Sequence, residues 1–126
     1  MQREVEVTFK SKVDDLELEF IYDGLLIEED NKILRYTEEI DDKAVDTAVF
    51  IDDTIMINRS NGVEMFQEFI EGEATVMDYS VGGMSFNIIV NTETIVNEDN
   101  YLKIVYSTEL GEAVQNHEIE IYYSWL

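Results

Sequence analysis

Residues 55–69, IMINRSNGVEMFQEF, contain the pattern that decides the fold. Two runs that alternate apolar with polar residues flank a Ser-Asn-Gly segment, and this arrangement is typical of a β-hairpin. If Asn61-Gly62 formed a two-residue turn, Ile55 would lie opposite Glu68 and the apolar face of the hairpin would be broken. A longer loop is therefore expected.

A three-residue loop over 60–62, with Gly62 at positive φ, restores the apolar face because it places Ile57 opposite Met65. Arg59 then lies on the same face as Ile57. The pattern thus predicts that one of only 8 basic residues points into the protein.

Period-two alternation continues along the whole chain, and turn residues recur about every 8–12 residues. No segment has convincing helical periodicity, and proline is absent. The expected strands span 3–10, 16–27, 32–39, 44–51, 55–59, 63–69, 73–81, 84–96, 101–110 and 113–124.

Two glycine turns support this interpretation. Gly82-Gly83 fits a two-residue turn, and Gly111-Glu112 has the Gly-first pattern of a type II′ turn. Both turns bring apolar residues together on one face without adjustment. The aligned pairs include Tyr79 with Phe86, Met77 with Ile88, Tyr106 with His117, and Ile104 with Ile119.

Successive hairpins imply an antiparallel meander, and a meander of about 8–10 strands with one apolar face closes into a barrel. Gly24, inside a long strand, would allow a bend where the barrel turns a corner. The length of 126 residues suits one core, so 1–126 is expected to form a single domain.

The balance of charge is strongly acidic, with 29 Asp and Glu and a net charge of −21. Such a surface repels nucleic acid and anionic membranes, so neither is expected as a partner. A solubilising surface is the simplest explanation. Adaptation to high salt and a basic protein partner are the alternatives.

The chain has no cysteine and no apolar stretch that would span a membrane. The first residues, MQREVEVTFK, are charged and strand-like rather than a signal peptide. A cytoplasmic location is expected.

The strand over 32–39 places Leu34, Tyr36 and Glu38 on the inner face. The interior is therefore more polar than a plain core requires, because an unpaired buried polar atom costs about 1–3 kcal/mol. The expected inward residues with polar function are Tyr22, Tyr36, Glu38, Thr47, Arg59, Gln67, Tyr79, Thr92, Tyr106 and His117.

An isolated buried charge is far more costly than a paired one, so Arg59 and Glu38 are expected to contact each other. This pair could be purely structural or could contact a ligand. The tyrosines could likewise be amphipathic core residues. His117, the only histidine, lacks partners that would indicate catalysis or metal binding.

Motifs for catalysis and cofactors are missing, including the P-loop, Gly-x-Gly-x-x-Gly, His-Glu-x-x-His and Gly-x-Ser-x-Gly. The acidic clusters at 28–31 and 97–100 lack the spacing of an EF-hand loop. No cofactor, metal ligand or catalytic residue is therefore expected.

Several segments together resemble the YwiB-like family of bacterial proteins, which have a calycin-like (lipocalin-like) β-barrel and no assigned function. The segments are ILRYTEE (33–39), INRSNGVEMFQEF (57–69), SFNIIVNTETI (85–95) and KIVYSTELGE (103–112). The matching positions are Gly24, Tyr36, Glu38, Thr47, Arg59, Met65, Gln67, Phe69, Tyr79, Thr92 and Tyr106. The turn at 82–84 departs from the family's spacing, and Glu118 stands where a polar amide is expected, so no role is carried over to it.

The combined expectation is an all-β, calycin-like barrel that binds a small, partly apolar and anionic ligand without catalysis. The predicted ligand-binding residues are Tyr36, Glu38, Arg59, Gln67, Tyr79 and Tyr106. The alternative is a structural or protein-interaction domain with a filled barrel and an acidic outer surface. An enzyme that uses interior carboxylates is the weakest hypothesis, and the oligomeric state is left open.

Overall fold

The computed structural model describes residues 1–40 and 42–126. Ten strands account for most of these residues, and they agree with the expected strands to within three residues at each end. The strands are β1 (Gln2–Val13), β2 (Leu16–Glu28), β3 (Lys32–Ile40), β4 (Lys43–Ile51), β5 (Ile55–Ser60), β6 (Glu64–Phe69), β7 (Ala74–Val81), β8 (Met84–Glu98), β9 (Tyr101–Leu110) and β10 (Ala113–Trp125).

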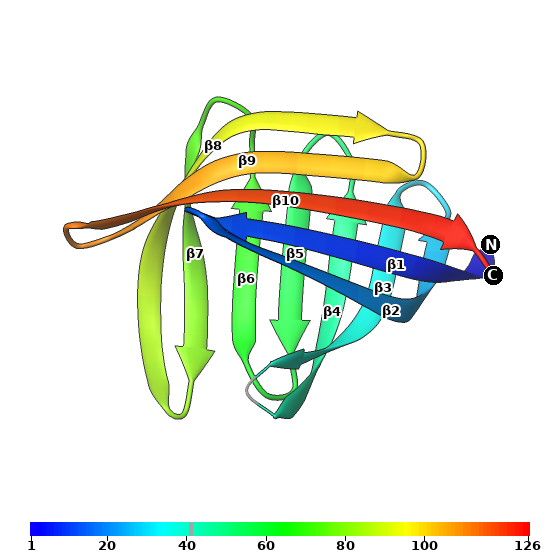
Figure 1. Ribbon diagram of the computed structural model, residues 1–126, viewed down its shortest axis with the longest axis horizontal. Helices are drawn as coiled ribbons and strands as arrows, with labels where there is room; N and C mark the ends of the chain where they lie inside the picture. The colour runs from blue at the N-terminus through cyan, green and yellow to red at the C-terminus, as the bar shows by residue number, and fades with distance from the viewer. Residues whose placement is uncertain (41) are drawn as a thin grey trace.

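The strands form a closed antiparallel barrel in which each strand pairs with the next along the chain and β1 pairs with β10. In Figure 1, β3–β7 run across the direction of β1, β9 and β10. β8 joins the two directions and carries a bulge between Thr92 and Thr94. Because a bulge bends a strand, it is the natural device for this change of direction. The predicted all-β meander barrel is confirmed.

Both glycine turns have the predicted register. Gly82 and Gly83 have φ of 58° and 80°, as a type I′ turn requires. Met77 lies opposite Ile88 as predicted. Across the turn at Gly111, which has φ of 62°, Ile104 pairs with Ile119 and Tyr106 with His117.

The predicted register of the β5–β6 hairpin is wrong by two residues. Arg59, not Ile57, lies opposite Met65, and the connecting residues are 61–63 rather than 60–62. The positive φ is at Asn61 (68°) and not at Gly62. Because the register differs by an even number of residues, each side chain stays on its predicted face of the sheet, and Arg59 still points inward.

Packing against β4 explains the shift. Val63, in the loop, is buried with 1% exposure. A Cβ on Gly62 would lie 3.2 Å from the Cβ of Lys43, so this glycine is needed for close approach rather than for its φ. Asn61 also donates a hydrogen bond to the carboxylate of Asp46 in β4.

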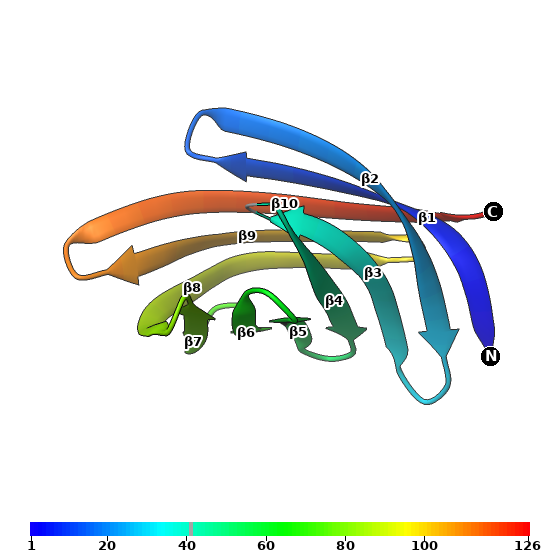
Figure 2. The ribbon, with the colours of Figure 1, turned by 90° about the horizontal axis from the view of Figure 1, so that it is seen from below.

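The interior of the barrel is filled mainly by aliphatic and aromatic side chains. Gly24 belongs to this packing, because a Cβ there would lie 2.7 Å from the carbonyl oxygen of Arg35. β2 curves over this region in Figure 2. The buried core consists of Val5, Val7, Phe9, Leu26, Leu34, Tyr36, Val49, Ile51, Ile55, Ile57, Phe69, Met77, Val90, Leu102, Ile104, Tyr106, Ile119, Ile121 and Tyr123.

The wall of the barrel is splayed between β2 and β3. β2 pairs with β3 only from Gly24 onward, whereas all of β2 from Leu16 pairs with β1. Figure 2 shows the N-terminal half of β2 diverging from β3 while it stays beside β1. Among the described residues, no helix has the length and apolar character needed to cross a membrane.

Candidate functional site

A buried ion pair lies inside the barrel. The Nε of Arg59, in β5, donates to Oε1 of Glu38, in β3, at 2.8 Å. Their side chains are only 10% and 7% exposed. Thr47, on the intervening strand β4, donates its hydroxyl to the same carboxylate oxygen. The predicted contact between Arg59 and Glu38 is confirmed.

Arg59 makes two weaker contacts on its other side. Its Nη1 lies 3.1 Å from the sulfur of Met65 and 3.4 Å from Oε1 of Gln67. Burial lowers the pKa of Arg59, but Glu38 and nearby tyrosines more than offset this, so the net pKa is raised. The guanidinium therefore stays charged. We call Tyr36, Glu38, Thr47, Arg59 and Gln67 the inner polar cluster.

The polar atoms of this cluster are not all satisfied. The hydroxyl of Tyr36 is buried and has no hydrogen-bond partner among the described residues. Within the part of the chain that the structure describes, Nη2 of Arg59 donates no hydrogen bond and Oε2 of Glu38 accepts none. Burial, and secondarily the charge of Glu38, raises the pKa of Tyr36, so its phenol is neutral and able to donate.

Three aromatic rings connect the cluster with the splayed wall. Tyr22 stacks on Tyr36 with ring centres 5.2 Å apart, and Phe20 stacks on Tyr22 at 6.1 Å. Phe20 is 41% exposed, whereas Tyr36 is 5% exposed. Together the rings form a ladder from solvent to the buried hydroxyl. We call Phe20, Tyr22 and Tyr36 the aromatic ladder.

Of the two remaining predicted ligand-binding residues, Tyr106 lies beside the cluster and Tyr79 lies further away. Tyr106 is buried, and its ring stacks on His117 at 4.7 Å and meets Phe69 edge-on. Burial raises the pKa of Tyr106, and Arg59 and Gln67 partly offset this effect. Tyr79 is one strand further away, opposite Met65, and is only half-buried.

Sequence reasoning therefore placed the inward residues correctly but missed two contributors. Met65 contacts Arg59 because of the two-residue shift in register, and the wrong register had placed it beside Ile57. Phe20 was not singled out, although strict alternation along β2 places it on the face of Tyr22. That alternation is the signal that could have found it.

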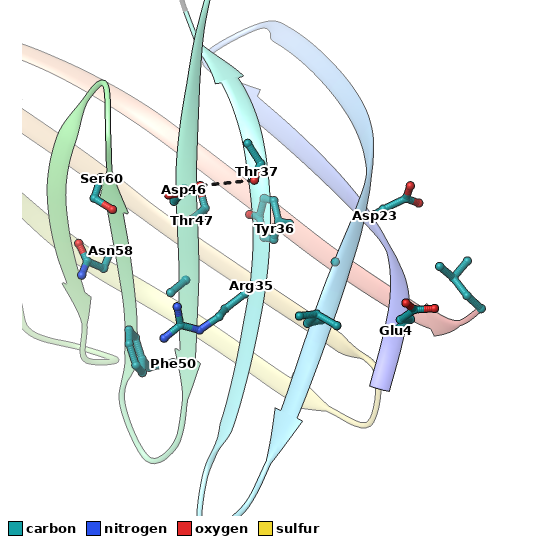
Figure 3. A pocket seen from close by; sticks show the side chains of 14 residues that line it. Glu4, Asp23, Arg35, Tyr36, Thr37, Asp46, Thr47, Phe50, Asn58 and Ser60 are labelled. Atoms are coloured by element: carbon teal, nitrogen blue, oxygen red, sulfur yellow. Dashed lines mark hydrogen bonds between the residues drawn. The ribbon is translucent and has the colours of Figure 1, made fainter. Parts of the chain in front are cut away.

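A separate cavity of about 710 Å³ lies on the outer side of β2–β5. Figure 3 shows Arg35 extending from β3 toward Phe50, with Asn58 on the far side and Thr37 bonded to Asp46. Most of its lining comes from outward positions, and Tyr36 is the one predicted ligand-binding residue in it. A smaller cavity of about 440 Å³ at the β8 bulge is lined in part by Tyr106 and His117. Among the described residues no group of acids or histidine is arranged to hold a metal ion.

The fold and the interior define a closed antiparallel β-barrel protein with a buried ion pair. A family model described as "Domain of unknown function (DUF1934)" matches residues 4–121, so the chain belongs to this family.

Known relatives agree with this assignment. The chain is 27% identical over 136 residues to the "Uncharacterized beta-barrel protein YwiB" of Bacillus subtilis (strain 168), covering 98% of this chain and 96% of that protein. It is also similar to the crystal structure of the ywiB protein from Bacillus subtilis, with a TM-score of 0.89 and 23% identity. That match covers 99% of this chain and 93% of the other. The expected resemblance to the YwiB-like family is confirmed.

Proposed function

We propose that the protein binds a small molecule at the inner polar cluster, without catalysis. The ligand has a polar or anionic group that reaches Arg59 and Tyr36, and an apolar, preferably flat, part that lies along the aromatic ladder. The predicted ligand-binding residues Glu38, Gln67 and Tyr106 orient or border this group.

The observation that carries the proposal is the incomplete pairing of a deeply buried cluster. An unpaired buried hydroxyl costs about 1–3 kcal/mol, and such groups in folded proteins call for an explanation. Tyr36 has such a hydroxyl. It lies near the charges of Glu38 and Arg59, both of which influence its pKa. A ligand that accepts from Tyr36 and Arg59 would satisfy these donors.

The chemistry of the cluster supports binding rather than turnover. Hydrolysis by paired carboxylates needs two acids about 5–10 Å apart that face one pocket. The inner polar cluster contains one acid, Glu38, and its Oε1 is engaged by both Arg59 and Thr47. Arg59 and Glu38 largely neutralise each other, so a ligand with a partly apolar body suits the site better than a highly charged one.

The alternative, a structural or interaction domain, is favoured by a different observation. The barrel holds a large apolar core, and the cavity of about 710 Å³ lies outside it. In this case the ion pair would serve only to hold β3, β4 and β5 together. The two proposals differ in what Tyr36 does.

Native mass spectrometry of protein purified from its own host tests the proposal, with Tyr36→Phe as the variant and Tyr122→Phe as the control. Tyr122 is an outer-surface tyrosine whose hydroxyl bonds to Glu120. We expect a retained small molecule on the wild type and on Tyr122→Phe, and at least about tenfold less on Tyr36→Phe. Equal retention by all three proteins, or retention by none, would contradict binding at this site.

A further inference from the structure

The N-terminal half of β2 is a free strand edge. Residues 16–23 pair with β1 on one side, and among the described residues no strand pairs with them on the other side. The facing residues of β3, 37–40, pair only with β4. Free edges present unpaired backbone N–H and C=O groups, which are ready to accept another strand.

A comparable gap in pairing, between β6 and β7, is bridged by a further contact, whereas the described residues leave the gap between β2 and β3 unbridged. β6 and β7 pair only over Glu64–Phe66. Beyond these residues the Thr75 hydroxyl of β7 donates to the backbone carbonyl of Glu68 in β6 and so bridges the gap. In the described part of the chain, no equivalent contact reaches the free edge of β2.

The inner face of this edge is apolar and exposed. Leu16, Leu18 and Phe20 face the same side as Val13, Ser11 and Phe9, their partners on β1. Phe9 is buried in the core, yet Leu16, Leu18 and Phe20 are 61%, 48% and 41% exposed. Clustered exposed apolar side chains mark interaction sites.

The outer face of the same edge carries three acids and one isoleucine. Glu17, Glu19 and Asp23 are exposed, and Ile21, between Glu19 and Asp23 on this face, is 60% exposed. Lys12 and Lys10 on β1 lie opposite Glu17 and Glu19. These lysines also lie near Glu118 and Glu120 of β10, so acids still outnumber bases on this surface.

We propose that residues 16–23 of β2 dock an extended segment of a basic partner protein, which adds to the barrel as an extra strand. Its apolar side chains pack on Leu16, Leu18 and Phe20, and its alternating Lys or Arg side chains face Glu17, Glu19 and Asp23. Backbone hydrogen bonds supply affinity, and the alternating pattern supplies specificity. The net charge of −21 attracts such a partner over a distance.

A second copy of this chain fits the edge less well. Two β2 edges paired antiparallel would place Glu17 and Glu19 of one copy beside those of the other, and like charges on opposed strands are destabilising. The net charge of each copy adds to this repulsion. A basic segment has the complementary charge.

An octapeptide of alternating Lys and Val, labelled with a fluorophore, serves as the probe. Its control is the peptide of the same composition with four Lys followed by four Val. Fluorescence anisotropy at about 0.15 M salt, near the physiological value, measures both affinities. We expect the alternating peptide to bind at least tenfold more tightly. We also expect it to slow hydrogen exchange of amides within 16–23 at least tenfold.

Two substitutions locate the site on the protein. Leu18→Lys places a positive charge on the exposed apolar face, which is how natural edge strands are protected from pairing. It is expected to weaken peptide binding at least tenfold. Ile89→Lys adds the same charge at another exposed apolar residue, in a part of β8 that pairs with both β7 and β9. It should change affinity less than threefold.

Three outcomes would overturn the proposal. The two peptides could bind equally and release together as salt is raised, which would mean attraction by charge alone. Leu18→Lys could bind as tightly as the wild type. Analytical ultracentrifugation could show a concentration-dependent dimer whose amides at 16–23 are already protected, which would make a second copy the occupant.

Discussion

Breaking the Arg59–Glu38 pair from one side is expected to destabilise the fold strongly. Arg59→Met leaves Glu38 with only Thr47 as a hydrogen-bond donor, and Glu38→Leu leaves a buried guanidinium without an anion. Removing one partner of a buried pair typically costs about 3–5 kcal/mol. With both side chains at or below 10% exposure, solvent cannot replace the lost partner.

Replacing both residues is expected to cost less than the sum of the single changes. The double variant contains no orphan charge, and its remaining loss comes from Thr47 and Gln67, whose polar groups lose a partner. Each buried polar group left without a hydrogen-bond partner costs about 1–3 kcal/mol. The double variant should therefore lose about 2–6 kcal/mol, against about 6–10 kcal/mol for the sum of the single variants. With both losses near the middle of their ranges, the coupling energy should exceed about 2 kcal/mol.

Urea unfolding followed by far-UV circular dichroism measures the free energy of unfolding of the four proteins in the cycle. A domain of this kind has about 5–15 kcal/mol in total, so a single variant that fails to fold but is rescued by the second substitution gives the same answer. Additive losses, with a coupling energy below about 0.5 kcal/mol, would refute the inference that the two charges stabilise each other.

Four further outcomes follow from the structure. Tyr36→Phe removes the unpaired hydroxyl and should raise the free energy of unfolding of the ligand-free protein by about 1–3 kcal/mol; a loss of stability in urea would show that the hydroxyl has a partner. Gly24→Ala should cost about 1–3 kcal/mol, more than Gly62→Ala, because its Cβ would meet a carbonyl oxygen at 2.7 Å rather than a side chain at 3.2 Å; equal costs in urea would contradict this. Burial lowers the pKa of His117, with a smaller opposing effect from Asp14, so as pH falls the unfolded chain takes up this proton at a higher pH than the folded protein does. His117→Gln should then lose less stability than the wild type between about pH 7 and 5.5, and parallel pH profiles would exclude a role for this histidine. Raising salt to about 0.5 M should raise the melting temperature modestly by screening the acidic surface, whereas a protein that unfolds without molar salt would indicate halophilic adaptation.

Local chemistry explains why most of the fold was predictable. Alternation at period two located all ten strands, and glycines that can adopt positive φ fixed the registers at Gly82-Gly83 and Gly111. The inward direction of Arg59 also followed from alternation, because any even error in register preserves the face. The contact with Glu38 then followed from the cost of an unpaired buried charge.

Other features depend on contacts between strands that are distant in the sequence. The β5–β6 loop is shifted because Val63 is buried and Gly62 lies against Lys43 of β4, which no local turn preference encodes. The Tyr36 hydroxyl lacks a hydrogen-bond partner because, among the described residues, no polar group of the surrounding strands lies within reach, and this too depends on how those strands are placed. The free edge of β2 exists because pairing with β3 stops at Gly24, a result of how the whole barrel closes. The sequence alone determined which side chains point inward, since that depends on alternation within a strand. Only the tertiary structure decided which of their polar atoms lack partners and where the wall is open, since both depend on the relative placement of all the strands.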